Sequence, residues 1–410
     1  MRTSVYTLLV LGCSSGPKED AVPPQRTGSW VAVDLHVHSS VGSNDTDGLS
    51  PIADVAAVAR ERGLSMVVIT DHSNSAGSMG CSSGDVEDCP NQGPEFPAIA
   101  EAIAASDEQL ELAVGVEISP VASLEFTSEP TGHIGCIPPS ITAFEGVASP
   151  VIDRPVGAVD GGSGIAWCHA QGGLAVVNHP YTLAGWLNYD WSSMDYDAIE
   201  VFNGGARFDA GDWDAVQSWA CDVSLGRRVV AVGGSDAHRA ATPSPPEGPL
   251  DQAIGFPITW VWQDDDSSLS LLEALWEGRT IVADPRTQLD VWAVYDGDRF
   301  GPGQRMAARP GQFSLHVETT VDQSGLRLEV LDLFSGACTD DLRRSHTEAP
   351  VVSPNLIHVE DLAAGESRSL QLMLSTESVE RVVVWIRPIE AVGIGHDGVA
   401  LASPIFVDLN

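Results

Sequence analysis

Histidine and carboxylate residues recur directly after short apolar runs of this sequence. In an extended strand, side chains two positions apart point the same way, so His36 and His38 can reach one ion. Two surface histidines would explain this pair alone, but six of the 11 histidines occupy such positions. Imidazole suits Zn, Fe, Ni or Cu, and carboxylate oxygens favour Mn and Mg. The residues that indicate a metal site are Asp34, His36, His38, Asp71, His72, Glu117, His133, His179, Glu200, Asn203, Asp236 and His238.

Strand and helix patterns alternate over residues 30–285, which predicts an α/β domain. Ser50-Pro51 is typical of a helix start, and residues 213–225 form an amphipathic pattern that stops at Gly226. The carboxyl ends of parallel strands meet at one face, so the polar residues that follow them are expected to converge. Strands are expected at 31–33, 66–69, 112–114, 174–177, 199–202 and 229–232.

The pattern changes near Gln288. Segments such as 290–295, 313–317, 326–330, 369–374 and 381–386 alternate with period two between turn residues, and helical patterns are scarce. Residues 286–410 are therefore predicted to form a small all-β, sandwich-like accessory domain.

Charge and length exclude several classes of protein. The 410 residues carry 57 acidic and 21 basic side chains, a formal net charge of −36. Such a surface repels phosphate backbones, so we expect no nucleic-acid partner and no docking on an anionic membrane. Beyond the N-terminus, no apolar run approaches the roughly 18 residues of a membrane span.

The N-terminus resembles a bacterial lipoprotein signal. Arg2 precedes a short apolar stretch, and Val10-Leu-Gly-Cys13 replaces a lipobox, so residues 1–13 are predicted to end in a lipidated Cys13. A plain secretory peptide or a chance apolar start are the alternatives. Residues 14–29 are typical of a tether. The expected location is the bacterial cell envelope, on the periplasmic side or at the outer membrane, with membrane attachment only through the lipid.

Six further cysteines fit an exported chain. Cys81 and Cys89 flank a polar loop and are expected to form a disulfide; zinc binding is the alternative, although no C-x-x-C pair is present. The partners of Cys136, Cys168, Cys221 and Cys338 remain open, as does the oligomeric state.

The ordered set D-x-H-x-H, T-D-H, G-x-E, G-H, N-H-P and S-D-x-H resembles the polymerase-and-histidinol-phosphatase (PHP) superfamily of metallohydrolases, and its CehA/McbA-like branch in particular. The resemblance implies a distorted (β/α)7 barrel with two or three divalent ions, Mn, Zn or Fe. It implies one ion held by His36, His38, Glu117 and Asp236, and a second held by Glu117, His133 and His179. A third would be held by Asp47, His72 and His238. An insertion over 41–45 leaves Asp45 as an alternative to Asp47.

Two ions that share a water lower its pKa, which supplies hydroxide as a nucleophile. The first hypothesis is hydrolysis of a small, phosphorylated ester, with Glu117, Asp71, Asp34 and Arg239 as catalytic candidates. Asp34 and Asp71 could orient imidazoles or a water, or simply cap strand ends. Glu200 and Asn203 could touch the site or close its rim. Arg207 is a second candidate anion clamp, and either arginine could equally be a surface residue.

Two alternatives remain. The same hydroxide could attack a carbamate, carboxylic ester or amide, with Tyr181, Trp186 and Trp191 lining the pocket. The chain could also be a non-catalytic surface lipoprotein whose β domain binds a partner or a glycan while metals stabilise it.

Overall fold

The computed structural model describes residues 27–43, 45–73, 96, 98–118, 132–147, 161–181, 195–204, 208–246, 251–265, 270–338, 348–389 and 397–409. The predicted signal peptide with Cys13, most of the tether, the Cys81–Cys89 pair, Trp186, Trp191 and Arg207 lie outside the described residues.

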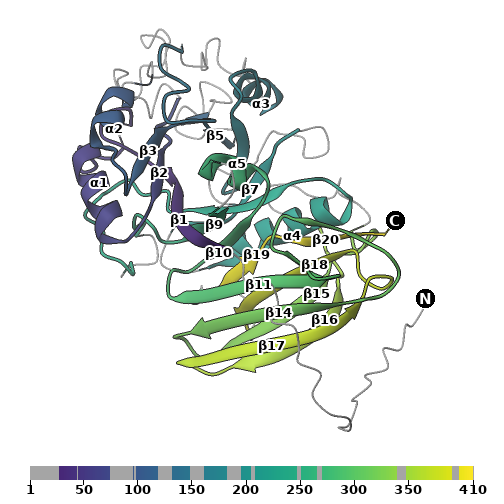
Figure 1. The fold of residues 1–410 in the computed structure, drawn as a ribbon. Coiled ribbons are helices and arrows are strands. Elements are labelled where there is room, and N and C mark those ends of the chain that lie inside the picture. Colours follow the sequence, from purple (N-terminus) through teal and green to yellow (C-terminus); the bar gives the residue numbers. More distant parts are fainter. Residues whose placement is uncertain are drawn as a thin grey trace.

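The first part of the chain is an α/β unit, as predicted (Figure 1). Its strands are β1 (Gly28–Val37), β2 (Met66–Ile69), β3 (Glu111–Val114), β4 (Val116–Ile118), β5 (His133–Ile137), β6 (Leu174–Asn178), β7 (Ala198–Asn203), β8 (Val230–Gly234), β9 (Ile258–Asp264) and β10 (Thr280–Ala283). Its helices are α1 (Ile52–Glu61), α2 (Ile99–Ala105), α3 (Gly161–Ala170), α4 (Ala210–Ser224) and α5 (Leu271–Trp276).

The local sequence explains where the helices begin and end. Helix α1 follows Pro51, whose fixed φ suits a helix start, and it buries Ile52, Val55, Ala56 and Ala59 on one face. Helix α4 begins with a capping box, in which the Asp209 side chain accepts from the Asp212 amide and the Asp212 side chain accepts from the Asp209 amide. Gly226, at φ +87°, follows its last turn in the left-handed conformation that glycine tolerates.

The strands of the α/β unit divide between two sheets. In one, the order is β10-β9-β1-β2-β3, with β1 parallel to β2 and antiparallel to β9. In the other, the order is β4-β5-β6-β7-β8, with β5 antiparallel to both neighbours. The sheets meet at single bridges, Val37 with Ala237 and His72 with Glu117. The distorted (β/α)7 barrel that the family resemblance implies is therefore not evident among the described residues, because the strands pair in two separate sheets and β5 runs antiparallel to both neighbours.

The last part of the chain is all-β among its described residues. Its strands are β11 (Thr287–Tyr295), β12 (Asp298–Phe300), β13 (Arg305–Ala308), β14 (Gln312–Val321), β15 (Leu326–Asp332), β16 (Asn355–Leu362), β17 (Glu366–Ser375), β18 (Arg381–Pro388), β19 (Ala400–Ala402) and β20 (Ile405–Leu409). A four-stranded sheet, β12-β11-β14-β17, packs on β15, β18 and β20 across a shared core that includes Val291, Leu315, Val330, Val384 and Ile405.

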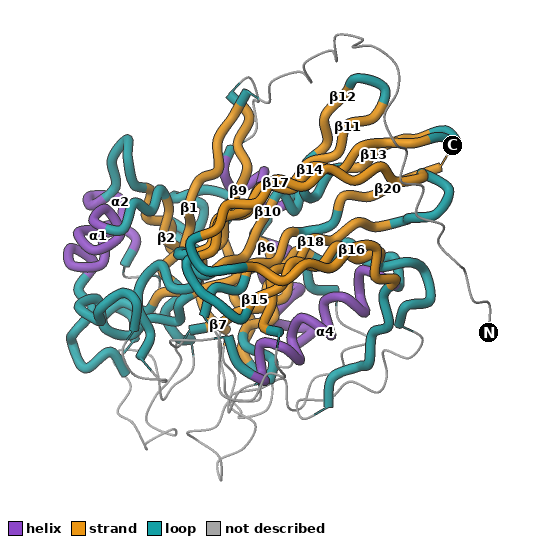
Figure 2. Tube along the Cα trace, turned by 90° about the horizontal axis from the view of Figure 1, so that it is seen from below, coloured by secondary structure: helices purple, strands orange, loops and turns teal. Residues whose placement is uncertain are grey.

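The two parts share one continuous sheet. Strand β10 pairs with β9 on one side and with β19 on the other, so an eleven-stranded sheet runs from β3 to β13. Helices α1 and α2 lie at one end of the molecule and the C-terminal strands at the other (Figure 2). Backbone hydrogen bonds therefore cross the boundary expected near residue 286.

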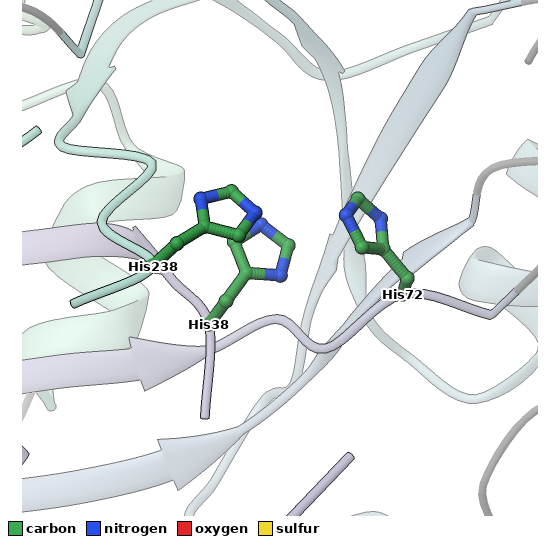
Figure 3. Close-up of side chains that lie close together, drawn as sticks. All are labelled: His38, His72 and His238. Carbon is green, nitrogen blue, oxygen red and sulfur yellow. The ribbon is translucent and has the colours of Figure 1, made fainter. Parts of the chain in front are cut away.

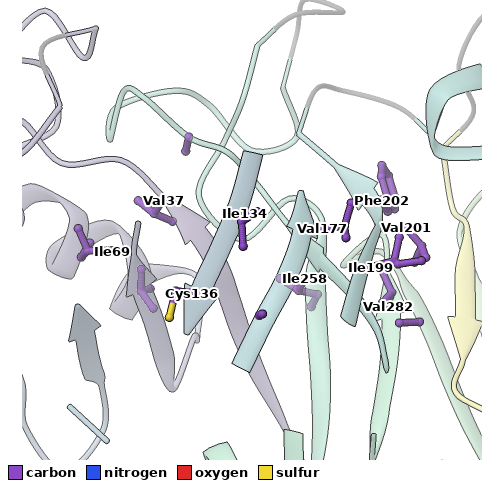
Figure 4. Packing of buried hydrophobic residues seen from close by; sticks show 14 of the residues in the cluster. Val37, Ile69, Ile134, Cys136, Val177, Ile199, Val201, Phe202, Ile258 and Val282 are labelled. Atoms are coloured by element: carbon purple, nitrogen blue, oxygen red, sulfur yellow. The ribbon is translucent and has the colours of Figure 1, made fainter. Parts of the chain in front are cut away.

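Apolar side chains anchor the strands just below the polar ends. Val37, Ile69, Ile134, Val177 and Ile199 are fully buried in one cluster (Figure 4). Close packing of this kind leaves little freedom to the residues that immediately follow each strand.

Two disulfides join described elements: Cys136 with Cys168, and Cys221 with Cys338. The first links β5 to α3, and the second links α4 to the segment after β15. Both are consistent with an exported protein. Among the described residues, no helix combines the length and apolarity needed to span a bilayer.

Candidate metal centre

The carboxylate of Glu117 lies at the centre of the histidine cluster and is completely buried. It projects from β4, directly after the break at Gly115. Its Oε1 lies 2.7 Å from Nδ1 of His133, 3.1 Å from Nε2 of His179 and 3.3 Å from Nε2 of His36. Its Oε2 lies 2.8 Å from Nδ1 of His72. The two oxygens thus face different imidazoles, as a carboxylate that bridges two ions would.

Asp236, after β8, brings a second carboxylate to the rings at the end of β1. Its Oδ1 lies 3.2 Å from Nε2 of His36 and 3.1 Å from Nε2 of His38. The two ring nitrogens are 3.2 Å apart. Two imidazoles bound tetrahedrally to one ion at about 2.0–2.1 Å would be roughly 3.3 Å apart. These three side chains are already spaced as ligands of a common cation.

A third group of histidines lies beside the first. The rings of His38 and His238 are stacked, with centroids 4.1 Å apart, and His72 faces them from the end of β2 (Figure 3). Asp45 completes this group: its Oδ2 lies 2.9 Å from Nε2 of His72 and 3.3 Å from Nε2 of His238.

Asp47 does not lie with the other predicted ligands. Its side chain is 68% exposed and meets the 60% exposed Arg239 at 3.3 Å. Asp45 stands where Asp47 was expected, because its carboxylate, and not that of Asp47, lies against His72 and His238. The same geometry places Arg239 in a surface ion pair, away from the carboxylates of the cluster.

Asp34 does not contact an imidazole. It is fully buried, and its Oδ1 accepts from the backbone amide of Ser235 at 3.0 Å, while Oδ2 accepts from that of Gly255 at 2.7 Å. Burial raises its pKa, and these hydrogen bonds partly oppose the rise. Asp34 therefore ties β1 to the segments after β8 and before β9, as the capping interpretation expects.

The hydrogen bonds of the Asp71 carboxylate to serines connect it to the cluster. It accepts from the amide and hydroxyl of Ser39, at 2.6 and 2.7 Å, and from the hydroxyl of Ser43 at 3.0 Å. Ser43 Oγ in turn lies 3.2 Å from Nδ1 of His38. Burial raises the pKa of Asp71 to about 6, against these hydrogen bonds.

Several supporting contacts come from residues to which the sequence assigned no firm role. Glu200 Oε1 lies 3.2 Å from Nδ1 of His36, so it does touch the site. Asn178 donates to Glu117 at 3.0 Å. Gln252 donates to Asp236 at 2.8 Å and lies 3.1 Å from His238. The N-H-P motif contains Asn178, but Gln252 sits in a loop, and no strand-end signal marks it.

Two cluster residues have strained backbone conformations. His179 has φ +26° and Asp236 has φ +53°, both in the left-handed region that residues other than glycine seldom adopt. The amide of His179 donates to Glu200, and that of Asp236 donates to the His36 carbonyl. These bonds hold the strained conformations, a feature that is typical of functional sites.

Burial lowers the pKa of two of the clustered imidazoles, and neighbouring charges modify the shift. Burial lowers the pKa of His38 to about 3, with His238 and His72 adding to the effect. Burial also lowers the pKa of His133 to about 4, despite Glu117. Burial opposes ionisation of Glu117, but His133, His36 and His72 hold its pKa well below the usual range. At neutral pH the central carboxylate is charged and these two rings are neutral, the forms that bind cations.

The donor set fits divalent metal ions. Four overlapping groups of three donors have all ligand atoms within 4.8 Å of one another. Nε2 of His133 is buried and has no hydrogen-bond partner among the described residues. An imidazole nitrogen buried in this way normally has a partner, and a cation would provide one. The groups are His38, His72 and His238; His36, His38 and Glu117; His36, His179 and Asp236; and His72, Glu117 and His133.

Comparisons with known proteins add little. No family model matches the chain, and no curated protein matches it. Among solved structures, an Endonuclease Q complex with a 27-mer duplex substrate that carries an abasic lesion is similar at a TM-score of 0.39 and 12% identity. The match covers 61% of this chain and 57% of that chain. Function is therefore inferred from the site itself.

Proposed function

We propose that this protein is a metal-dependent hydrolase with a di- or trinuclear centre that cleaves a small, phosphorylated ester. The position of Glu117 supports the proposal most directly, because its two oxygens face separate sets of imidazoles. Structural zinc sites are closed, four-coordinate arrangements and have no need of so many convergent donors. The PHP-type assignment and the CehA/McbA-like branch belong to the same proposal.

The residues would share the ions in overlapping groups. His36, His38 and Asp236 would hold one ion together with Glu117, and His133 with His72 or His179 would hold the second across the same carboxylate. Asp45, His72 and His238 would hold a third. Bound ions of this type lower the pKa of a coordinated water and neutralise charge on the attacked ester.

The chain's own residues would set the geometry of the reaction. Glu200 would accept a hydrogen bond from the Nδ1–H of His36, so that Nε2 of the ring would be the atom that binds an ion. Asn178 and Gln252 fix the rotation of Glu117 and Asp236 by donating to one oxygen of each. Ligands held in this way lose less freedom on binding, which increases metal affinity.

The described aromatic residue does not favour the carbonyl chemistry. Tyr181 places its hydroxyl 2.5 Å from Ser218 Oγ and packs against the core, so its ring serves helix α4. Tyr181 therefore gives no support to a carbamate, carboxylic ester or amide, and the phosphoester remains the first proposal. The net charge of −36 disfavours a nucleic-acid substrate.

A substrate panel tests the proposal. The purified protein would be analysed for bound metal, loaded with Mn, Zn or Fe, and assayed on bis-p-nitrophenyl phosphate, p-nitrophenyl phosphate and a naphthyl carbamate. We expect phosphoester turnover that His36→Ala abolishes and His169→Ala, on the exposed face of α3, retains. Turnover of the carbamate alone would show that the substrate is a carbamate and not a phosphoester. Metal-dependent melting without any turnover would support a purely structural centre instead.

We also propose that the chain is an exported lipoprotein anchored through Cys13. Expression of the full chain in a bacterium should place the wild type in the membrane fraction and Cys13→Ser in the soluble fraction. Equal distribution of the two would contradict the anchor without affecting the hydrolase proposal.

A further inference from the structure

A pocket of about 680 Å³ lies between the start of β1 and the four-stranded sheet. Its volume is within the roughly 300–1,000 Å³ range of small-ligand sites. The side chains that matter for its chemistry are Trp30, Trp260, Asp290, Glu318, Thr320 and Ser367.

One wall of the pocket is aromatic and held in place. Trp30 and Trp260 project from the same face of the β1–β9 pair, because Trp30 is opposite Trp262 and Ala32 is opposite Trp260. Both rings are half-buried. The indole N–H of Trp30 donates to Asp290 at 3.1 Å, and its ring meets Trp262 edge-on at 5.3 Å. The ring therefore cannot rotate freely. A ligand that packs on it would lose little free energy to the ordering of this side chain.

The other wall is a row of polar side chains. Asp290 is paired with Glu318, which is paired with Ser369 on the outward side of β11, β14 and β17. The next row contains Thr320 and Ser367, whose hydroxyls are 2.8 Å apart. Two carboxylates and three hydroxyls thus lie side by side across three strands, near the two indoles.

We propose that this pocket binds a neutral oligosaccharide. A pyranose ring has an apolar C–H face that packs on an indole and an equatorial rim of hydroxyls that donate to carboxylates. Asp290 and Glu318 disfavour an anionic ligand, because Arg368, which also lines the pocket, is already paired with Glu360 and Glu366. The hydroxyl-rich wall favours a polyhydroxylated ligand over a simple organic cation, which would need only rings and charge.

The pocket is separate from the metal centre. Trp30 begins β1, whereas His36 is at its other end, six residues or about 20 Å away along an extended strand. Saccharide binding therefore does not depend on the hydrolase proposal, and each can fail alone.

Calorimetric titration of the full chain with cellohexaose, maltohexaose and chitohexaose tests the inference. We expect one of the three to bind, and both Trp30→Ala and Glu318→Gln to weaken it by roughly tenfold or more. Glu318 is exposed, so its replacement retains the fold if Trp30→Ala does not. The matched control is Glu108→Gln, an exposed residue of the α/β unit. His36→Ala should bind the saccharide as the wild type does.

Three results would overturn the inference. They are no binding of any hexasaccharide by the wild type, binding that both pocket variants leave unchanged, and binding of tetramethylammonium in place of the saccharides.

Discussion

Oε1 of Glu200 lies 3.2 Å from Nδ1 of His36, on the side of the ring opposite Glu117. Its Oε2 accepts from the amide of His179 and the side chain of Asn203, both at 2.9 Å. A glutamine at this position would place its NH2 group against another donor in either orientation, either the Nδ1–H of His36 or the N–H groups of His179 and Asn203. We therefore expect Glu200→Gln to lower metal affinity by about 10- to 100-fold.

Metal competition with a chromophoric chelator measures that affinity. Glu111→Gln, exposed at the start of β3, is the matched control and should bind as the wild type does. Unchanged affinity in Glu200→Gln would mean that the contact with His36 has no role in orienting the ring.

Glu117→Gln should lose more activity than any other single ligand change. The glutamine side chain has nearly the same shape as glutamate. It is neutral, however, and would replace the negative charge that faces two sets of imidazoles. We expect phosphoester turnover to fall by about a thousandfold or more, with a parallel fall in bound metal measured by elemental analysis. Glu145→Gln on the surface is the control. Retention of both metal content and rate would remove Glu117 from the bridging position.

Gly234→Ala should damage the site by crowding. A Cβ at this position would lie 2.8 Å from Oε1 of Glu200 and would also press on the Cβ of His36. We expect a loss of about 1–3 kcal/mol in the free energy of unfolding, together with weaker metal binding. Gly311→Ala, whose nearest atom would be 3.8 Å away, serves as the control in chemical denaturation. Equal stability of the two variants would show that β8 can shift away from β1.

Asp71 should make the metal-free protein less stable as the pH rises. Burial raises the pKa of Asp71 from 3.8 to about 6, so the folded protein binds this proton more tightly than the unfolded chain. The resulting stability is fully present below pH 3.8 and is lost as the pH rises through about 6. Two pH units correspond to roughly 3 kcal/mol.

Asp71→Asn resembles the protonated form and should remove that pH dependence. The free energy of unfolding of the wild type, minus that of the variant, should fall by about 2.4 kcal/mol between pH 4 and pH 7. Urea titrations with a chelator present measure it, and Asp54→Asn on the exposed face of α1 is the control. A difference that stays constant across this range would contradict the expectation.

The disulfides should differ in their contribution to stability. Cys221 and Cys338 are 117 residues apart, and Cys136 and Cys168 are 32 apart. The longer loop restricts the unfolded chain more, so Cys221→Ser/Cys338→Ser should cost about 1 kcal/mol more than Cys136→Ser/Cys168→Ser. Denaturation of both double variants measures the difference. The reverse order would show that strain or residual structure outweighs loop length.

The sequence predicts the cluster better than the sheets. Strand-end positions are readable because an apolar run followed by a polar pair is a local pattern, and His36, His72 and Glu117 were found in this way. Asp45 could not be chosen over Asp47, because both belong to one turn whose direction depends on distant contacts with His72 and His238. Gln252 carries no local signal at all.

Long-range pairing explains the other differences. Strand β10 pairs with β19, which comes more than a hundred residues later in the chain. The hydrophobic pattern of neither segment indicates which strand it pairs with. The antiparallel direction of β5 is similarly set by its neighbours. The α/β class was therefore predictable from the sequence, whereas the distorted (β/α)7 barrel implied by the family resemblance is not evident.

The unbroken run of strands through β9, β10, β19 and β18 has a mechanical consequence. The two parts of the chain cannot rotate relative to each other about a hinge without breaking main-chain hydrogen bonds of this sheet, so we expect them to move as one rigid unit. If the pocket beside Trp30 and Trp260 binds a saccharide surface, the metal centre would therefore be held at a fixed distance and orientation from that surface.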